Sequence, residues 1–337
     1  MNKLTKENEA FYSRISELLW TARKTVVQKV NKTIVNTYFE IGRLIVEEEQ
    51  NGKSKAEYGQ NLIQKLSQHL TTEFGRGFST TNLKQMRTFY LTYSISQTVS
   101  DEFRLSWSHY LFLMRIDQME ERNFYEIEAT ENNWSLRELQ RQFNSALYER
   151  LALSRNKNEV KELSEKGQII EKAQDSLKDP YVLEFLGLPE ETKYSETELE
   201  QKLIDKLEHF FLELGKGYTF VGRQVRFTFD DKHFRTDLVF YNRLLQCFVL
   251  IDLKIGEITH QDLGQMQMYV NYYDRFVKLD SENKTIGIIL CKKKNDTLVE
   301  ITLPESNEQI FASKYLTVLP SKKELKELLN NKFEDLK

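Results

Sequence analysis

Asp237, Asp252 and Lys254, two carboxylates and one amine, stand among apolar residues in a short stretch of the chain, residues 234–257 (FRTDLVFYNRLLQCFVLIDLKIGE). Asp252 and Lys254 are two residues apart, so on one strand their side chains point to the same face. Asn242-Arg243 lies between two strand-like runs, which predicts an antiparallel hairpin. If the connecting loop has an even number of residues, Asp237 faces the same side from the partner strand.

Charges inside an apolar strand core are costly unless they have partners. One carboxylate and one lysine can form an ion pair, but a second carboxylate leaves excess negative charge that a divalent cation would neutralise. Hard oxygen donors, without a nearby cysteine or a histidine pair, favour Mg²⁺ or Mn²⁺ over zinc. The alternative is an Asp237 on an edge strand beside an exposed Asp252–Lys254 ion pair.

A third carboxylate is expected from the helix predicted over residues 196–214. Glu200 has apolar residues at +3, +4, +7 and +11, so it lies on the apolar face of that helix. A carboxylate there would reach the sheet and join a metal site. Alternatively, Glu200 sits in a frayed first turn and interacts with the helix dipole, and Glu208 is the weaker competitor for the metal.

The helix predicted to open near Thr259 carries Gln265 and Tyr269. A spacing of four places both side chains on one helical face, from which they could reach a phosphate or a base. An ordinary amphipathic face is the alternative interpretation.

The elements that must position these residues divide the chain in two. All four prolines lie from Pro180 onward, and helical spacing of apolar residues predicts an all-helical region over 1–155. Residues 156–178 are strongly polar and predict a linker or connecting helix. Residues 179–337 mix a helix over 196–214, strands over 218–228, 235–241, 246–255 and 285–291, and a helix over 261–277, which is typical of an α/β sandwich. One further helix is expected from a capping box at Ser135 to about Leu153.

The helical region has a candidate role of its own. Helices over 58–71 and 79–90, joined by GRGF (75–78), resemble a helix-turn-helix or winged-helix unit with an overlong turn. Asn82, Lys84 and Arg87 near the start of the second helix could contact a nucleic acid groove. Partner binding, or a homodimer through the long first helices, is the alternative.

Composition and net charge say more about the location of the protein than about its ligand. A net charge of −3 gives no support to nucleic acid binding, although residues 51–100 hold six Lys/Arg against two Glu. No apolar run is long enough to cross a bilayer, and residues 1–12 lack the apolar stretch of a secretory signal. Cys247 and Cys291 each lie in an apolar segment without CxxC spacing, as expected of buried small hydrophobes in a reducing cytoplasm.

These residues together resemble a known set of motifs. Asp237, Asp252-x-Lys254 and Gln265-x-x-x-Tyr269 are similar to the PD-(D/E)XK nuclease motifs with the Q-x-x-x-Y extension of RecB-like nucleases. Nearly the whole chain resembles the bacterial YhcG-like family, through DPYVLEFLGL (179–188), LELGKGYTFVGRQ (212–224) and DLKIGEITHQDLGQMQMYVNYYD (252–274). The chain departs from the motif at Thr236, where the motif's name places proline.

The resemblance implies an α+β two-domain chain: an all-α N-terminal domain and a restriction-endonuclease-like C-terminal domain with a central mixed sheet flanked by helices. It implies Mg²⁺-dependent hydrolysis of phosphodiester bonds in DNA, in restriction, repair or mobile-element defence, with or without partner proteins. Asp237, Asp252 and Lys254 would be catalytic. The metal ligands would be Asp237, Asp252, the Leu253 carbonyl and Glu200, and the substrate would contact Gln265, Tyr269, Gln224, Asn82, Lys84 and Arg87. A non-catalytic DNA- or protein-binding subunit on the same fold is the competing hypothesis.

Overall fold

The computed structural model describes residues 3–51, 56–94, 103–155, 157–188, 194–229 and 231–334. The chain divides into two compact units, Met1–Gln140 and Arg141–Lys337, and each is described by itself. Within the described ranges, no helix combines the length and the apolar character needed to span a bilayer.

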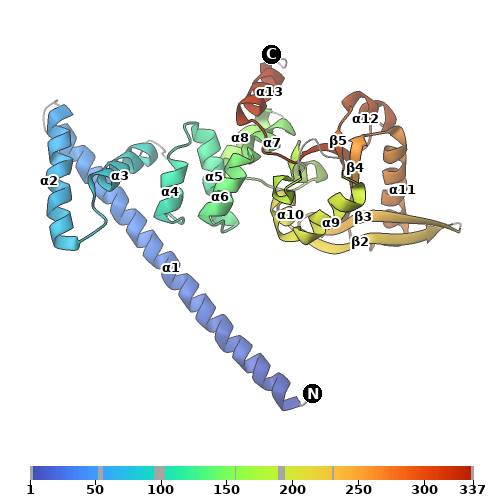
Figure 1. Ribbon diagram of the computed structural model, residues 1–337, viewed down its shortest axis with the longest axis horizontal. Helices are drawn as coiled ribbons and strands as arrows, with labels where there is room; N and C mark the ends of the chain where they lie inside the picture. Colours follow the sequence, from blue (N-terminus) through green and yellow to red (C-terminus); the bar gives the residue numbers. More distant parts are fainter. Residues whose placement is uncertain are drawn as a thin grey trace. The chain divides into compact units, whose positions relative to one another are not determined.

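The regular secondary structure in the described residues of unit 1 is entirely helical (Figure 1). Its helices are α1 (Lys3–Asn51), α2 (Ala56–Phe74), α3 (Thr80–Tyr93), α4 (Trp107–Leu113) and α5 (Met119–Glu131), followed by the start of α6 (Leu136–Asn144). Ser79 caps α3, because its side chain accepts a hydrogen bond from the Asn82 backbone N–H at 3.2 Å. The prediction of a helical N-terminal region is confirmed, and no strand that could form a wing occurs in the described part of unit 1.

Helices α1 and α3 pack backbone against backbone at Gly42. A Cβ atom at this position would lie 2.1 Å from the Met86 carbonyl oxygen, so only glycine allows this approach. Next to this crossing is a cluster of aromatic rings from α1, α3 and α4 and from Phe103, in which Phe89 is fully buried. Phe39, Phe89, Tyr93, Phe103, Trp107 and Tyr110 have neighbouring ring centroids 5.0–6.0 Å apart.

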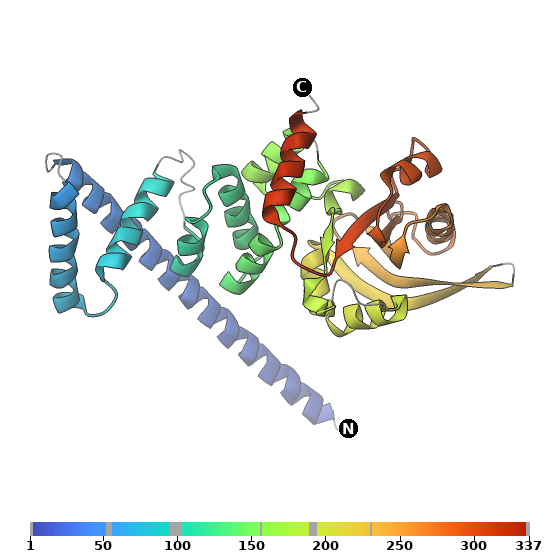
Figure 2. The ribbon, with the colours of Figure 1, turned by 45° about the horizontal axis from the view of Figure 1, so that its top comes forward.

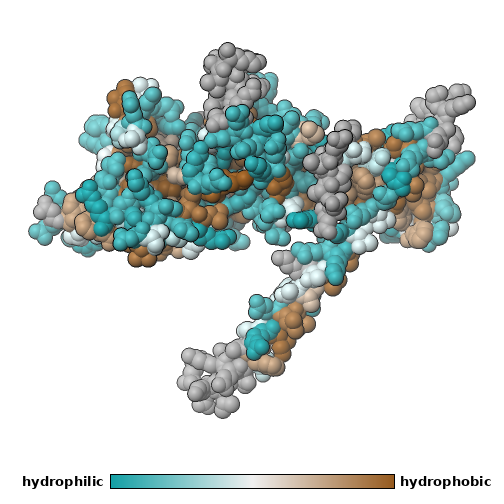
Figure 3. Space-filling view, turned by 180° about the vertical axis from the view of Figure 1, so that it is seen from behind, coloured by the Kyte–Doolittle hydropathy of each residue, from teal (hydrophilic) through white to brown (hydrophobic). Residues whose placement is uncertain are grey.

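The first half of α1 projects away from these contacts and carries exposed apolar side chains (Figure 3). Leu18 is 68% exposed and Trp20 is 69% exposed, values that contrast with the fully buried Val35 further along the same helix. The predicted homodimer through the first helices stays a prediction, and this segment is the surface that it would use.

Unit 2 is built on a six-stranded mixed sheet, whose longer strands are visible in Figure 2. Its strands are β1 (Tyr181–Val182), β2 (Tyr218–Phe229), β3 (Lys232–Asn242), β4 (Cys247–Glu257), β5 (Ile286–Lys293) and β6 (Ile310–Leu316), in the order β1-β6-β5-β4-β3-β2. The first four in this order are parallel; β3 pairs antiparallel with β4, and β2 pairs antiparallel with β3. The predicted mixed sheet flanked by helices is confirmed.

Helices cover both faces of the sheet, which explains why β4 is apolar on both sides. One face packs against α9 (Glu196–Asp205) and α10 (Leu207–Leu214), with Ile251 and Leu253 in its core. The other face packs against α11 (His260–Phe276) and α12 (Asp296–Thr302), with Leu250 and Ile289 in its core. The remaining helices are α7 (Leu147–Leu153), α8 (Lys157–Lys166), α13 (Lys322–Glu334) and the short 3₁₀ turns Ala173–Ser176 and Glu184–Leu186.

Two of the predicted helices are each broken into two. The helix expected from Ser135 to Leu153 breaks at Ala146, whose φ of 53° is left-handed, and Arg150 Nε donates to the freed Ser145 carbonyl at 2.7 Å. The helix expected over 196–214 breaks at Lys206. Strands β1 and β6 were not predicted: β1 has only two residues, and β6 gains its pairing from β5 and β1, which are distant in the chain.

A buried ion network joins α7 to α10 inside unit 2. Glu213 and Arg150 are both fully buried and form an ion pair. Glu213 Oε1 also accepts from the Val182 N–H at 2.8 Å, and Lys178 Nζ donates to the Glu213 carbonyl. Burial alone would raise the pKa of Glu213, but Arg150 and Lys178 hold that pKa below its usual value. The carboxylate is therefore ionised and fastens β1 to α10.

Candidate active site

Asp237 and Asp252 meet where strands β3 and β4 part. The two strands pair from Asn242–Cys247 to Leu238–Ile251, and the four-residue turn between them meets the even-loop condition of the sequence prediction. Beyond the Leu238–Ile251 pair the two strands are no longer paired, which leaves an opening between β3 and β4. The Asp237 side chain lies in this opening, and its Oδ2 accepts a hydrogen bond from the Leu253 N–H at 2.8 Å. The aspartates are thus brought together as neighbours on adjacent strands.

Asp252 is only 4% exposed, and its charge is costly in this position. Burial, and then the neighbouring Asp237 carboxylate, raise the pKa of Asp252 to about 7, although Lys254 opposes both effects. Lys254 Nζ lies 2.9 Å from Asp252 Oδ2. The predicted same-face placement of these two residues agrees with this contact, and the alternative of an exposed pair does not.

The Lys254 ammonium is surrounded by carboxylates. Burial would lower its pKa, but Asp252, Glu196 and Asp237 together raise it. Glu196 Oε2 lies 3.8 Å from Lys254 Nζ. The amine therefore stays charged and is held at the mouth of the opening between β3 and β4.

Glu200 approaches the same opening from α9. It is 6% exposed, and the Gln224 amide joins it to Asp237: Gln224 Nε2 donates to Glu200 Oε2 at 2.5 Å and to Asp237 Oδ1 at 3.0 Å. Burial, and then the Asp237 charge, raise the pKa of Glu200. Glu208 lies exposed on α10, beyond the helix break, so Glu200 is the glutamate of the predicted pair that reaches this site.

Gln265 and Tyr269 face the site from α11. Gln265 Nε2 donates to the Tyr269 hydroxyl, and Tyr269 is 1% exposed. The pKa of Tyr269 is raised mainly by burial and then by the charges of Asp252 and Asp237. Its hydroxyl therefore lies within the electrostatic field of both aspartates, and the predicted placement of Gln265 and Tyr269 on one helical face agrees with their hydrogen bond.

The chemistry of the donors fits a hard divalent cation. Among the described residues, no three His, Cys, Asp or Glu side chains stand close enough to ligate one ion as they are arranged. Two aspartates, with a glutamate linked to them by a neutral amide, nevertheless leave more negative charge than Lys254 balances. The Gln224 amide group lies between the Glu200 and Asp237 carboxylates. The negative charge of these oxygens also favours a hard divalent cation.

Both units of the chain resemble known proteins. Residues 174–330 match the model of the YhcG PDDEXK nuclease domain, and residues 14–150 match that of the DUF1016 N-terminal domain. The chain is 38% identical to the "Putative nuclease YhcG" of Escherichia coli (strain K12), over 96% of this chain and 95% of that protein. The chain belongs to the YhcG family. The family's C-terminal nuclease domain therefore contains the opening between β3 and β4 described above.

A solved repair endonuclease from Pyrococcus abyssi overlaps with part of this YhcG-family chain. The overlap covers 37% of this chain and 49% of that one, at 14% identity and a TM-score of 0.25.

The three residues predicted to contact a groove lie in the DUF1016 N-terminal domain of this YhcG-family chain. Asn82 Nδ2 donates to the Gly77 carbonyl, and its Oδ1 accepts from Trp107 Nε1 at 3.3 Å. Arg87 Nε forms an ion pair with Glu49 at 2.6 Å. Lys84 is exposed. The groove contact stays a prediction, and the structure gives Asn82 and Arg87 contacts inside unit 1.

Two features of the site were not found in the sequence. Glu196 was not singled out, although its spacing of four from Glu200 places both on one face of α9. Gln224 was assigned to the substrate, whereas the structure places its amide between two carboxylates. No local pattern marks this bridge, because Gln224 reaches it from the edge strand β2 with a left-handed φ of 48°.

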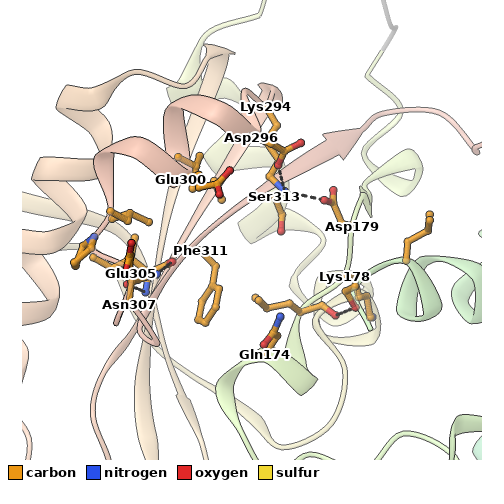
Figure 4. A pocket seen from close by; sticks show the side chains of 18 residues that line it. Gln174, Lys178, Asp179, Lys294, Asp296, Glu300, Glu305, Asn307, Phe311 and Ser313 are labelled. Carbon is orange, nitrogen blue, oxygen red and sulfur yellow. Dashed lines mark hydrogen bonds and ion pairs between the residues drawn. The ribbon is translucent and has the colours of Figure 1, made fainter. Parts of the chain in front are cut away.

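A cavity of about 570 Å³ in unit 2 involves none of the residues predicted for the site (Figure 4). In its wall, Lys294 Nζ lies 3.0 Å from Asp179 Oδ2 and 2.8 Å from Asp296 Oδ1. These ion pairs balance the lysine within the cavity wall, so the charge there already has partners.

Proposed function

We propose that this protein is a Mg²⁺-dependent nuclease that hydrolyses phosphodiester bonds in DNA, with Asp237, Asp252 and Lys254 as its catalytic residues. The observation that supports the proposal most is the convergence of both aspartates and the lysine amine at the opening between β3 and β4. The family membership agrees with it, since residues 174–330 match a nuclease domain.

The protein's own groups would each have a defined part. Asp237, Asp252, the Leu253 carbonyl and Glu200 would hold the cation, and Mn²⁺ would suit the same oxygen donors. A bound Mg²⁺ supplies neutralising charge, polarises the scissile phosphate and lowers the pKa of a bound water. Asp252 holds the Lys254 amine in place at 2.9 Å, where its charge would stabilise the negative charge that develops on the phosphate.

Tyr269 and Gln265 would position the substrate strand. Their side chains are hydrogen-bonded to each other, with Gln265 half-buried and Tyr269 buried. A pair fixed in this way loses little further side-chain freedom when a strand binds, which favours accurate placement of the phosphate. Such an activity would serve DNA restriction, repair or defence against mobile elements, alone or with partner proteins.

A cleavage panel tests the proposal. End-labelled duplex, single-stranded and branched DNA, and one RNA, are incubated with the purified full-length chain in Mg²⁺, Mn²⁺ or EDTA. We expect metal-dependent cleavage of at least one DNA, a loss of about 100-fold or more in Asp252→Asn and Lys254→Ala, and the wild-type rate in Glu208→Gln. Binding without turnover in every metal would instead support the non-catalytic subunit, and a wild-type rate in Lys254→Ala would refute the assignment of the lysine.

A further inference from the structure

Strands β2 and β3 run on past the opening as a two-stranded ribbon. Both views show the two strands extending beyond the rest of the sheet (Figures 1 and 2). Strand β4 pairs with β3 only from Leu238 onward, whereas β2 and β3 continue together from Val225–Thr236 to Phe229–Lys232. The described part of the ribbon therefore has no third strand.

One face of the ribbon is anchored to α11 by stacked rings. Phe227 stacks on Tyr272 with a centroid distance of 4.3 Å and meets Tyr269 edge-on at 5.2 Å. Phe234 stacks between Phe227 at 5.7 Å and Phe229 at 4.9 Å. These contacts leave little freedom for the ribbon's base to bend, so the opposite face is held in a fixed position.

The opposite face carries two arginines directly across from each other. Arg226 pairs in register with Arg235, and the next pair outward on the same face is Thr228 with His233. All four side chains are exposed. Like charges directly opposite on neighbouring strands destabilise a sheet. Within the described residues, neither arginine forms an ion pair that would offset this repulsion. The two facing arginines therefore lower the stability of the sheet, and a bound anion would restore it.

The arginine pair lies next to the proposed active site. Arg226 is two residues from Gln224 and Arg235 is two residues from Asp237, which is a distance of roughly 7 Å along each strand. A nucleic acid strand whose phosphate lies at the opening would therefore bring its neighbouring phosphate to the ribbon. A two-stranded ribbon is also one of the elements that the DNA major groove admits.

We propose that the outer face of the β2–β3 ribbon binds the phosphate backbone of the DNA substrate through Arg226 and Arg235, beside the site of cleavage. This inference rests on the proposed function for its ligand. The arginines are positioning residues: they hold the DNA and take no part in the chemistry.

The test measures DNA binding without cleavage. Full-length Asp252→Asn protein is titrated with a labelled duplex of about 30 base pairs at several salt concentrations, alone and with Arg226→Gln/Arg235→Gln. Arg243→Gln in the same background is the matched control, because Arg243 is exposed in the turn at the other end of β3. Each neutralised phosphate contributes about 0.9 to the slope of log K against log salt. We expect the double variant to lose about 2 from this slope and about tenfold or more in affinity at roughly 0.1 M salt, and the control to lose neither.

The two proposals fail in different ways. If the double variant matches the Arg243→Gln control in slope and affinity, the ribbon inference is wrong, whatever the cleavage panel shows. If the slope falls as expected but the wild-type chain cuts no nucleic acid in any metal, the ribbon inference stands and the proposed function is wrong. In the otherwise wild-type chain, the double variant should raise by about tenfold the DNA concentration that gives half-maximal single-turnover cleavage. An unchanged half-maximal concentration with a lower saturating rate would contradict a role in holding the DNA, and a chain that binds no DNA would overturn both proposals.

Discussion

Replacing Asp252 with asparagine should make the metal-free protein more stable, although it should abolish cleavage. In the folded chain the pKa of this carboxyl is raised from 3.8 to about 7, first by burial and then by Asp237. The unfolded chain loses the proton near pH 4, and the folded chain retains it until about pH 7. The native state therefore loses stability as the pH rises through this window, and the whole cost is present above pH 7.

The magnitude follows from the same two pKa values. A difference of about 3 pKa units corresponds to about 4 kcal/mol. Asparagine removes this cost but also leaves Lys254 without its partner at 2.9 Å, so we expect a net gain of about 2 kcal/mol at pH 8. For a unit of this size, that gain raises the unfolding midpoint by about 4–8 °C. At pH 4 the gain should vanish, because wild-type Asp252 is then protonated in the folded state.

The assay is scanning calorimetry of the full-length chain in EDTA at pH 4, 6 and 8. All three tryptophans (Trp20, Trp107 and Trp134) lie in unit 1, so their fluorescence follows unit 1 and gives an internal control that should not move. Glu208→Gln, at an exposed carboxylate, should leave both transitions unchanged. In saturating Mg²⁺ the wild type should instead have the higher unfolding midpoint, because it alone gains stability from binding the cation. An Asp252→Asn chain that is less stable than wild type at pH 8 would refute the reasoning.

Three further predictions follow from particular contacts. Mg²⁺ affinity, measured by titration calorimetry, should increase as the pH rises toward 7 and level off above it, because the cation must displace the Asp252 proton; equal affinity at pH 5 and pH 8 would contradict this. Gly42→Ala should lower the stability of unit 1 by about 3 kcal/mol, seen as a lower midpoint of tryptophan fluorescence, because its Cβ would meet the Met86 carbonyl at 2.1 Å. Gly264→Ala, with open space around it, is the matched control and should be neutral or stabilising. Glu213→Gln should cost unit 2 about 3–5 kcal/mol in calorimetry, because Arg150 would stay buried without its counter-charge; an unchanged transition would show that the ion network is not needed.

The sequence alone determined the local geometry of the site. Strand periodicity places Asp252 and Lys254 on one face, the four-residue turn sets Asp237 against them, and helical spacing brings Gln265 to Tyr269. Each of these relations spans only a few residues or one hairpin. Backbone repeat lengths fix such relations whatever the rest of the chain does.

The tertiary structure alone decided which distant groups join them. The choice of Glu200 over Glu208 depends on how α9 packs on the sheet and on a break at Lys206 that no proline or glycine marks. The Gln224 bridge depends on a left-handed residue in an edge strand, and β6 exists through its pairing with β5. These relations join residues far apart in the chain. Their free energy comes from packing and burial between elements, which leaves no periodic trace in the sequence.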